Sequence, residues 1–218
     1  NKTNAFGSFL SYLAGLDEVI SVPKWTCSGI LKGPKRNIAW RVLDAKYFGI
    51  PQQRRRLYVL AGGKDFKPES IIFEDFCTPI EDYPQSDLFF EKEGNQFECF
   101  RAYTDCLYAA YGTKWNGNAA AYNGSLFVLQ NKRLRRLSLL ECEKLMGFPD
   151  HYTNVPKASR TNRYKAIGNS WSVPVIKWLG KRILNPAMRA SITPTSFSSS
   201  ASMVDGSELM LIGNNLIP

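Results

Sequence analysis

The chain has 218 residues, of which 44% are hydrophobic, 13% aromatic and 22% charged, a composition that permits one medium domain or a small domain plus part of another. A formal net charge of +9 and a sequence pI of about 9.3 favour a polyanionic partner, although a basic domain without such a partner has the same composition. Five cysteines without a CxxC pair and a single histidine argue against a disulfide framework and a metal site, and no apolar run approaches the ~20 residues of a transmembrane helix.

The N-terminal part of the chain predicts one helix and then two strands. Over residues 4–16, apolar side chains recur at helical spacing, at Phe6, Phe9, Leu10, Leu13 and Leu16. The following stretch, with its prolines and glycines between residues 23 and 34, is interpreted as a loop. Residues 38–45 and 56–61 then predict two strands of a hairpin, joined by a tight turn over 47–51.

The remainder of the chain alternates between loop-like and helical patterns. Residues 63 to about 124 lack periodicity and are rich in Gly, Pro and Asn, whereas 125–130 predicts a strand. Ser138, with Glu141 three residues later, forms a capping box for a helix over 139–146, and Gly147 ends that helix. Two more helices are predicted, one over 160–167 and one beginning near Pro174. From residue 186 onward, a serine-rich composition predicts a disordered or loosely attached tail.

Three short segments carry the candidate chemistry: residues 49–56 (GIPQQRRR), residues 135–150 (RRLS, then Glu141, then GFPD) and residues 168–175 (GNSWSVPV). Taken singly, each has a simpler explanation, as solvated cations at a strand start, a helix stop and a helix cap. Together, in this order and around a loop-rich insert, they resemble the late motifs of the DNA cytosine-5 methyltransferase family. The stretches AWRVLDAKYFGIPQQRRR and YNGSLFV are similar in sequence to those of phage or prophage members.

The resemblance covers roughly residues 4–184 and implies an α/β fold. The chain would be the C-terminal part of a Rossmann-like S-adenosylmethionine-dependent methyltransferase domain with an inserted small, loop-rich target-recognition domain. Residues 1–63 would belong to the catalytic domain, 64–134 to the target-recognition domain, and 135–185 to helices that return to the catalytic domain. Residues 186–218 would form the disordered tail.

The resemblance assigns the bracing of the target cytosine to Gln52, Arg54 and Arg56. Methylation at C5 requires a thiolate to add at C6, and a rigid guanidinium at the ring edge stabilises the charge that develops. We expect Arg56 at the cytosine edge, Arg54 supporting the nucleophile loop and Gln52 acting as a structural hydrogen-bond partner. The cytosine has to leave the base stack to reach them, which costs on the order of a few kcal/mol.

The resemblance also implies cofactor and DNA contacts. Asn169 and Ser170 would contact S-adenosylmethionine, and a role as a helix cap is compatible with this. Trp171 would line the cofactor pocket or fill the core. In the target-recognition region, a loop mixes cationic, aromatic and amide side chains suited to duplex DNA, namely Lys114, Trp115, Asn116 and Asn118. The same density of Gly and Asn also fits simple turns. Arg135 is a further DNA candidate, although with Glu141 we expect it mainly to pack and to organise this region. No metal is expected.

The family's early motifs do not occur in these 218 residues: there is no Gly-rich cofactor loop, no Pro-Cys dipeptide for the nucleophile and no Glu-Asn-Val segment. The first residue is Asn1, which suggests that an upstream segment is missing. We therefore expect the chain to be inactive alone and to pair with an N-terminal half, in the cytoplasm of a bacterial or phage-infected cell and without membrane association. A non-catalytic DNA-binding or regulatory module of the same fold is the alternative, and the intact Arg54 and Arg56 favour the enzyme.

Overall fold

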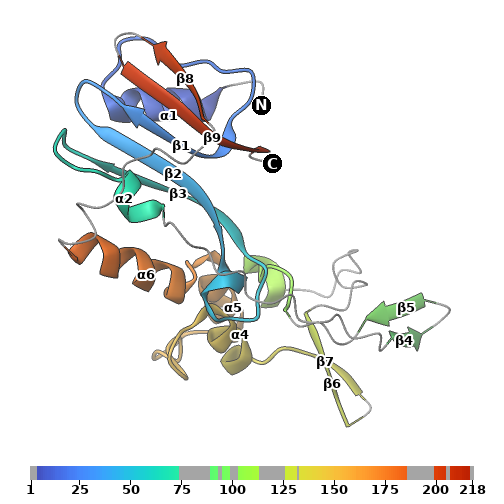
Figure 1. The fold of residues 1–218 in the computed structure, drawn as a ribbon. Helices are drawn as coiled ribbons and strands as arrows, with labels where there is room; N and C mark the ends of the chain where they lie inside the picture. Colours follow the sequence, from blue (N-terminus) through green and yellow to red (C-terminus); the bar gives the residue numbers. More distant parts are fainter. Residues whose placement is uncertain are drawn as a thin grey trace. The chain divides into compact units, whose positions relative to one another are not determined.

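The computed structural model describes residues 4–73, 89–92, 95–98, 103–112, 126–131, 133–185, 199–204 and 207–216. Two compact units share the chain, and each combines segments that are distant in sequence (Figure 1). The first, here the sheet unit, comprises residues 1–43, 56–77 and 178–218. The second, the helical unit, comprises residues 44–55 and 78–177.

The sheet unit is built on a five-stranded sheet with the strand order β3-β2-β1-β9-β8. Strand β1 pairs antiparallel with both β2 and β9, and β9 pairs antiparallel with β8. The helix α1 (Ala5–Ala14) contributes Leu10 and Ala14, both fully buried, to the core of this unit. The strands are β1 (Thr26–Lys32), β2 (Asn37–Asp44), β3 (Arg55–Gly62), β8 (Ser199–Val204) and β9 (Ser207–Leu216).

The predicted helix over 4–16 and the predicted strands over 38–45 and 56–61 are confirmed by α1, β2 and β3, and β2 and β3 are neighbours in the sheet. The prediction of a loop between residues 23 and 34 is wrong, because β1 occupies most of it. Gly29 does not break this strand. It lies opposite Trp40 of β2, and the missing side chain makes room for the fully buried indole ring.

The prediction of a disordered tail from residue 186 is corrected for the residues that form β8 and β9. Serine-rich composition predicts disorder, but the later part of the tail contains an apolar run that reaches the core of the sheet unit. Leu209 lies opposite Leu31 of β1, and both side chains are fully buried. Burial of these side chains opposes the loss of chain entropy on ordering, so the backbone hydrogen bonds of β8 and β9 form.

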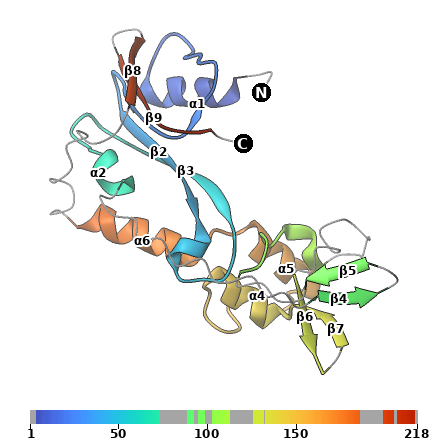
Figure 2. The ribbon, with the colours of Figure 1, turned by 45° about the vertical axis from the view of Figure 1, so that its right-hand side comes forward.

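The helical unit surrounds a second core. The helix α4 (Leu139–Met146) contributes Cys142 and Met146, and α5 (Arg160–Asn169) contributes Tyr164 and Ile167, all at most 3% exposed. Two hairpins, β4–β5 and β6–β7, belong to the same unit (Figure 2). Its other elements are η1 (Ala45–Phe48), β4 (Phe89–Lys92), β5 (Asn95–Glu98), η2 (Ala109–Gly112), β6 (Phe127–Gln130), β7 (Arg133–Arg136) and the first part of α6 (Val173–Leu184).

The predicted helix ends in this unit are confirmed in detail. Ser138 and Glu141 form the capping box of α4, and Gly147 ends the helix in the left-handed conformation, with φ of 78°. The predictions of a strand near 125–130, a helix over 160–167 and a helix from about 174 are met by β6, α5 and α6. A short α2 (Glu69–Ile72) completes the sheet unit. Within the described residues, the helices fall short of the length and apolar character needed to cross a membrane.

The close approach of β1 and β2 predicts that Gly29→Ala destabilises the protein. A Cβ at this position would lie 2.2 Å from a ring atom of Trp40, so the buried indole or the strand has to shift. We expect a loss of about 1–3 kcal/mol in the free energy of unfolding by urea titration. Gly63→Ala is the matched control, because a Cβ there meets nothing within 4 Å, and equal stability of the two variants would contradict the packing described.

Candidate active site

Gln52 is fully buried in the helical unit and acts as a structural link. Its amide nitrogen donates to the carbonyl of Leu145 at 2.8 Å, and its amide oxygen accepts from the backbone N–H of Leu107 at 3.1 Å. A parallel bridge between Gln52 and Thr104 lies alongside. One side chain thus joins the start of the arginine motif to the end of α4 and to the segment before η2.

Arg54 is the second buried member of the motif, with only 3% of the residue exposed. Its guanidinium donates to three backbone carbonyls, those of Leu107 at 2.8 Å, Gly168 at 3.0 Å and Ser170 at 2.8 Å. Asp44 accepts from the backbone N–H of Arg54 at 2.8 Å and so fixes the chain where the motif enters β3. The guanidinium therefore holds the third motif, at Gly168 and Ser170, against the segment around Leu107.

The third member of the motif, Arg56, has a different setting. It is the second residue of β3, it belongs to the sheet unit, and it is exposed. The structure thus brings Gln52 and Arg54 together as buried hydrogen-bond donors and leaves Arg56 at the surface. The family resemblance gave the two arginines different roles, but their different burial was not predicted from the sequence, because the two have the same side chain and are two positions apart.

The third motif combines a tight helix contact with exposed side chains. Gly168 lies against the backbone of η2, where an added Cβ would come within 2.5 Å of Ala109 N. Ser170 caps the end of α5, and its hydroxyl donates to the carbonyl of Ile167 at 2.6 Å. Asn169 is exposed, and Trp171 has 65% of its surface exposed. The motif therefore presents an amide and an indole at the surface of the helical unit.

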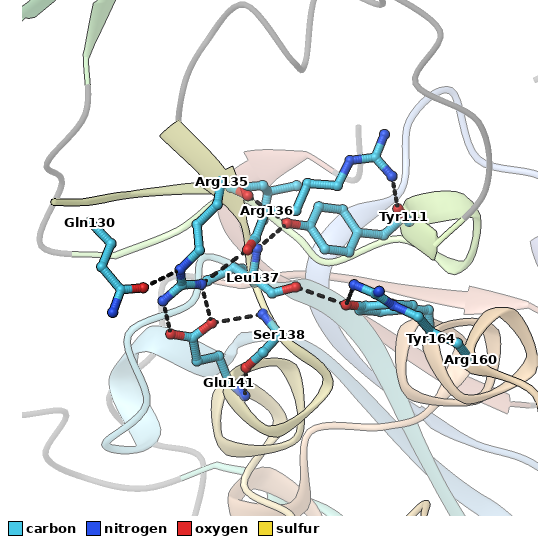
Figure 3. A network of polar contacts seen from close by, with 10 residues as sticks. Tyr111, Gln130, Arg135, Arg136, Leu137, Ser138, Glu141, Arg160 and Tyr164 are labelled. Carbon is cyan, nitrogen blue, oxygen red and sulfur yellow. Dashed lines mark hydrogen bonds and ion pairs between the residues drawn. The ribbon is translucent and has the colours of Figure 1, made fainter. Parts of the chain in front are cut away.

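Arg135 is engaged in a network around the start of α4 (Figure 3). Its guanidinium forms a bidentate pair with Glu141, at 2.8 and 2.9 Å, and its Nε donates to Gln130 at 2.6 Å. The guanidinium lowers the pKa of Glu141 to about 2. These contacts correspond to the packing role expected of Arg135, and a contact with DNA stays a prediction.

Two tyrosines that sequence analysis did not single out hold the same segment from the other side. Tyr111 accepts from the backbone N–H of Leu137 at 2.7 Å, and Tyr164 donates to the carbonyl of Leu137 at 2.8 Å (Figure 3). Their rings meet edge to face, with centroids 5.5 Å apart. Burial raises the pKa of Tyr111, so its hydroxyl stays protonated and donates to the Leu126 carbonyl at 2.6 Å. No spacing rule links residues this far apart.

A buried acid, Glu143, attaches the turn after α4 and the helix α5. It is fully buried, accepts from both the backbone N–H and the hydroxyl of Thr153, and pairs with Arg163 at 3.2 Å. Burial opposes ionisation, but the hydrogen bonds from Thr153 and Arg163 outweigh it and lower the pKa of Glu143. This acid was also not predicted from sequence.

Other predicted site residues fall outside what the structure describes, namely Lys114, Trp115, Asn116 and Asn118. Among the described residues, no group of three or more His, Cys, Asp or Glu side chains is arranged to hold a metal ion. Cys142 is fully buried, and burial raises the pKa of its thiol to about 12. It is therefore unsuited to act as a nucleophile.

A family model described as C-5 cytosine-specific DNA methylase matches residues 36–124 and 92–185. Among curated proteins, the chain is similar to a DNA N-6-adenine-methyltransferase of Escherichia phage P1, with 24% identity over 85% of this chain and 44% of the relative. It is also similar to the type II methyltransferases M.BsuFI of Bacillus subtilis (31% identity, 67% of this chain, 39% of the relative) and M.MspI of a Moraxella species (28%, 65% and 37%). The chain spans less than half the length of these relatives.

Among solved structures, the chain is similar to the Dnmt2 methyltransferase of S. pombe, with 19% identity and a TM-score of 0.45. The match covers 70% of this chain and 57% of the Dnmt2 chain. It is also similar to a methyltransferase of Entamoeba histolytica, EhMeth, with 17% identity and a TM-score of 0.39. That match covers 69% of this chain and 55% of the EhMeth chain.

The Arg135–Glu141 pair predicts a specific dependence of stability on pH. Because the folded-state pKa of Glu141 is about 2, below the usual 4.5, the pair stabilises the fold above about pH 4.5, and this contribution is lost as pH falls toward 2. We expect Glu141→Gln to be less stable than wild type at pH 6 and to approach it at pH 3, by urea unfolding. Asp150→Asn, which alters an exposed and longer ion pair, is the control. A difference that is constant with pH would contradict the assignment.

Proposed function

Because the chain belongs to the C-5 cytosine-specific DNA methylase family, we propose that it is the C-terminal portion of a DNA cytosine-5 methyltransferase. The mixed α/β structure, with its open sheet, fits the Rossmann-like fold of S-adenosylmethionine-dependent methyltransferases. The reaction we propose is transfer of a methyl group to C5 of a cytosine flipped out of duplex DNA. The observation that carries this proposal is the different burial of two arginines within one motif.

Gln52 and Arg54 fix the backbone of the motif by bonding to backbone groups that lie far along the chain. Arg56 follows on the exposed start of β3, and a guanidinium stays protonated at any physiological pH. A cation on a fixed strand suits the stabilisation of charge that develops on a substrate ring, because little reorganisation is needed as the charge forms. We assign this cytosine-bracing role to Arg56 and the positioning of the motif to Arg54 and Gln52.

The family implies S-adenosylmethionine, which supplies the methyl group when bound. The exposed amide of Asn169 and the exposed indole of Trp171 are suited to contact such a cofactor. The Ser170 hydroxyl already donates to Ile167, so it can only accept, as from an ammonium group. Close by in sequence, the hydroxyl oxygen of Ser172 is buried without a hydrogen-bond partner among the described residues. The polar groups of 169–172 fit the methionine end of the cofactor.

We further propose that the nucleophile comes from an N-terminal complement. The chain has no Pro-Cys dipeptide, Cys142 is buried with a raised thiol pKa, and Cys106 accepts a hydrogen bond from Arg54 at 3.2 Å. The complement would also supply the Gly-rich cofactor loop and the Glu-Asn-Val acid, and duplex DNA would bind the target-recognition region over 64–134. We place this reaction in the cytoplasm.

Two other functions remain to be compared with this one. A non-catalytic DNA-binding or regulatory module would have the same fold, but it would not need Arg56, which serves only the chemistry. The phage P1 relative is described as an adenine-N6 methyltransferase, and that chemistry modifies an exocyclic amine and not a ring carbon. The identity of the methylated base separates these alternatives.

The proposed function predicts methyl transfer only when the chain is complemented. Radiolabelled S-adenosylmethionine and duplex DNA would be incubated with the chain alone and with the chain co-expressed with the N-terminal half of a close relative. We expect label only in the mixture, recovered as 5-methyldeoxycytidine after nucleoside digestion. Arg56→Ala should lower the rate about 10²- to 10³-fold, because a charge-stabilising group is removed, without loss of stability.

Arg54→Met is the companion variant, and we expect it to lose activity together with stability, since its guanidinium is buried. Label recovered as N6-methyldeoxyadenosine would contradict the cytosine assignment. Label from the purified chain alone would contradict the need for a complement. Salt-sensitive DNA binding without label in the mixture would favour the non-catalytic module.

A further inference from the structure

The stretch that begins just after Asp150 and ends with α6 carries charge of only one sign. Residues 151–185 contain seven Lys or Arg residues and no Asp or Glu. The four of these cations that precede α6 lie within nine positions, at Lys157, Arg160, Arg163 and Lys165. Packing of α5 does not require such a bias, because its buried side chains, Tyr164 and Ile167, are uncharged.

Three of the four cations lie on the surface. Lys157, Arg160 and Lys165 are exposed, and we call them the α5 basic face. Arg163 differs from them because it turns inward to the buried Glu143. The carboxylates of α4 and the turn after it are all engaged with other cations, in the pairs Arg135–Glu141, Arg163–Glu143 and Lys144–Asp150. They therefore do not neutralise the α5 basic face.

Arg160 is held in place in a way that leaves its charge at the surface. Its guanidinium lies 5.7 Å from the ring centroid of Tyr164, and Nη2 is 3.5 Å from the tyrosine hydroxyl. Tyr164 is 3% exposed and is itself fixed by Leu137 (Figure 3). Stacking orients a guanidinium while occupying few of its N–H donors, so less entropy is lost when an anion binds. Arg136 is stacked in the same manner on Tyr111, at 5.8 Å.

The location of these charges is unfavourable for the helix itself. The first turn of α5 has no acidic residue, and Arg160 lies at the end where the helix dipole is positive. A cation there is repelled by the positive end of the dipole, whereas an anion is attracted to it. The exposed Thr161 and Asn162 add neutral donors between Arg160 and Lys165. An anionic partner accounts for an arrangement that the stability of the helix does not favour.

We propose that the α5 basic face binds the phosphate backbone of duplex DNA. This inference rests on the proposed function, and it places a DNA contact outside the region that the family resemblance assigns to target recognition. Duplex DNA carries one negative charge per about 1.7 Å of its axis, so several phosphates can lie near three cations, of which Lys157 precedes α5 and Arg160 and Lys165 lie within it. Contacts of this kind position the duplex and are independent of base sequence.

The test measures binding of a fluorescein-labelled duplex by the 218-residue chain, through anisotropy over a series of salt concentrations. We expect the triple variant Lys157→Gln/Arg160→Gln/Lys165→Gln to weaken binding at low salt at least about tenfold and to reduce the slope of log K against log salt by about 0.9 for each phosphate that the variant no longer neutralises. The matched control, Lys24→Gln/Lys35→Gln/Lys181→Gln, removes three exposed cations of the sheet unit that lie outside residues 64–134, and it should leave affinity and slope near those of wild type. The variant Lys157→Arg/Arg160→Lys/Lys165→Arg should restore the slope.

Circular dichroism and thermal melting check the fold of each variant. If the triple variant unfolds, Lys157→Gln and Lys165→Gln are tested singly, and each should reduce the slope. Equal affinity and slope for the triple variant and its control would overturn the inference while leaving the proposed function intact. Absence of salt-sensitive duplex binding by the wild-type chain would overturn both the inference and the binding of DNA by this portion.

Discussion

The helical unit depends on the burial of one guanidinium. Removing a cation such as that of Arg54 from water costs several kcal/mol unless its donors are satisfied. The backbone carbonyls of Leu107, Gly168 and Ser170 accept hydrogen bonds from the Arg54 guanidinium. The segments that supply these carbonyls are thereby brought to one point. Arg54 of the first motif therefore fixes the backbone position of the third motif.

The same principle recurs with neutral groups around Leu137. Its N–H and C=O cannot pair within α4, because the residue precedes the helix cap, and Tyr111 and Tyr164 satisfy them instead. The tyrosine rings also fill the core of the helical unit. Buried backbone groups without partners are costly, so each such side chain fixes a chain segment as well as filling space. The exposed Arg160 is then carried on an ordered framework.

How much of this could be predicted depends on the distance along the chain between interacting groups. The capping box of α4 was predictable because Ser138 and Glu141 are three residues apart. The different burial of Arg54 and Arg56 was not, because the backbone carbonyls that accept from the Arg54 guanidinium lie 53 to 116 residues away. Strand β1 was missed because Gly29 indicates a loop unless its contact with Trp40 is known. The prediction of a disordered tail rested on its high serine content. It did not consider that Leu209 could pair β9 with β1.

Hydrogen exchange measured by mass spectrometry on Arg54→Met tests the dependence of the helical unit on this guanidinium most directly. The account predicts that peptides covering 104–109 and 167–172 lose protection together and by similar factors, because the same side chain holds both. Lys144→Met, which removes an exposed cation of the same unit, should leave both segments protected. Loss of protection in one segment alone, or in neither, would contradict the central role of Arg54.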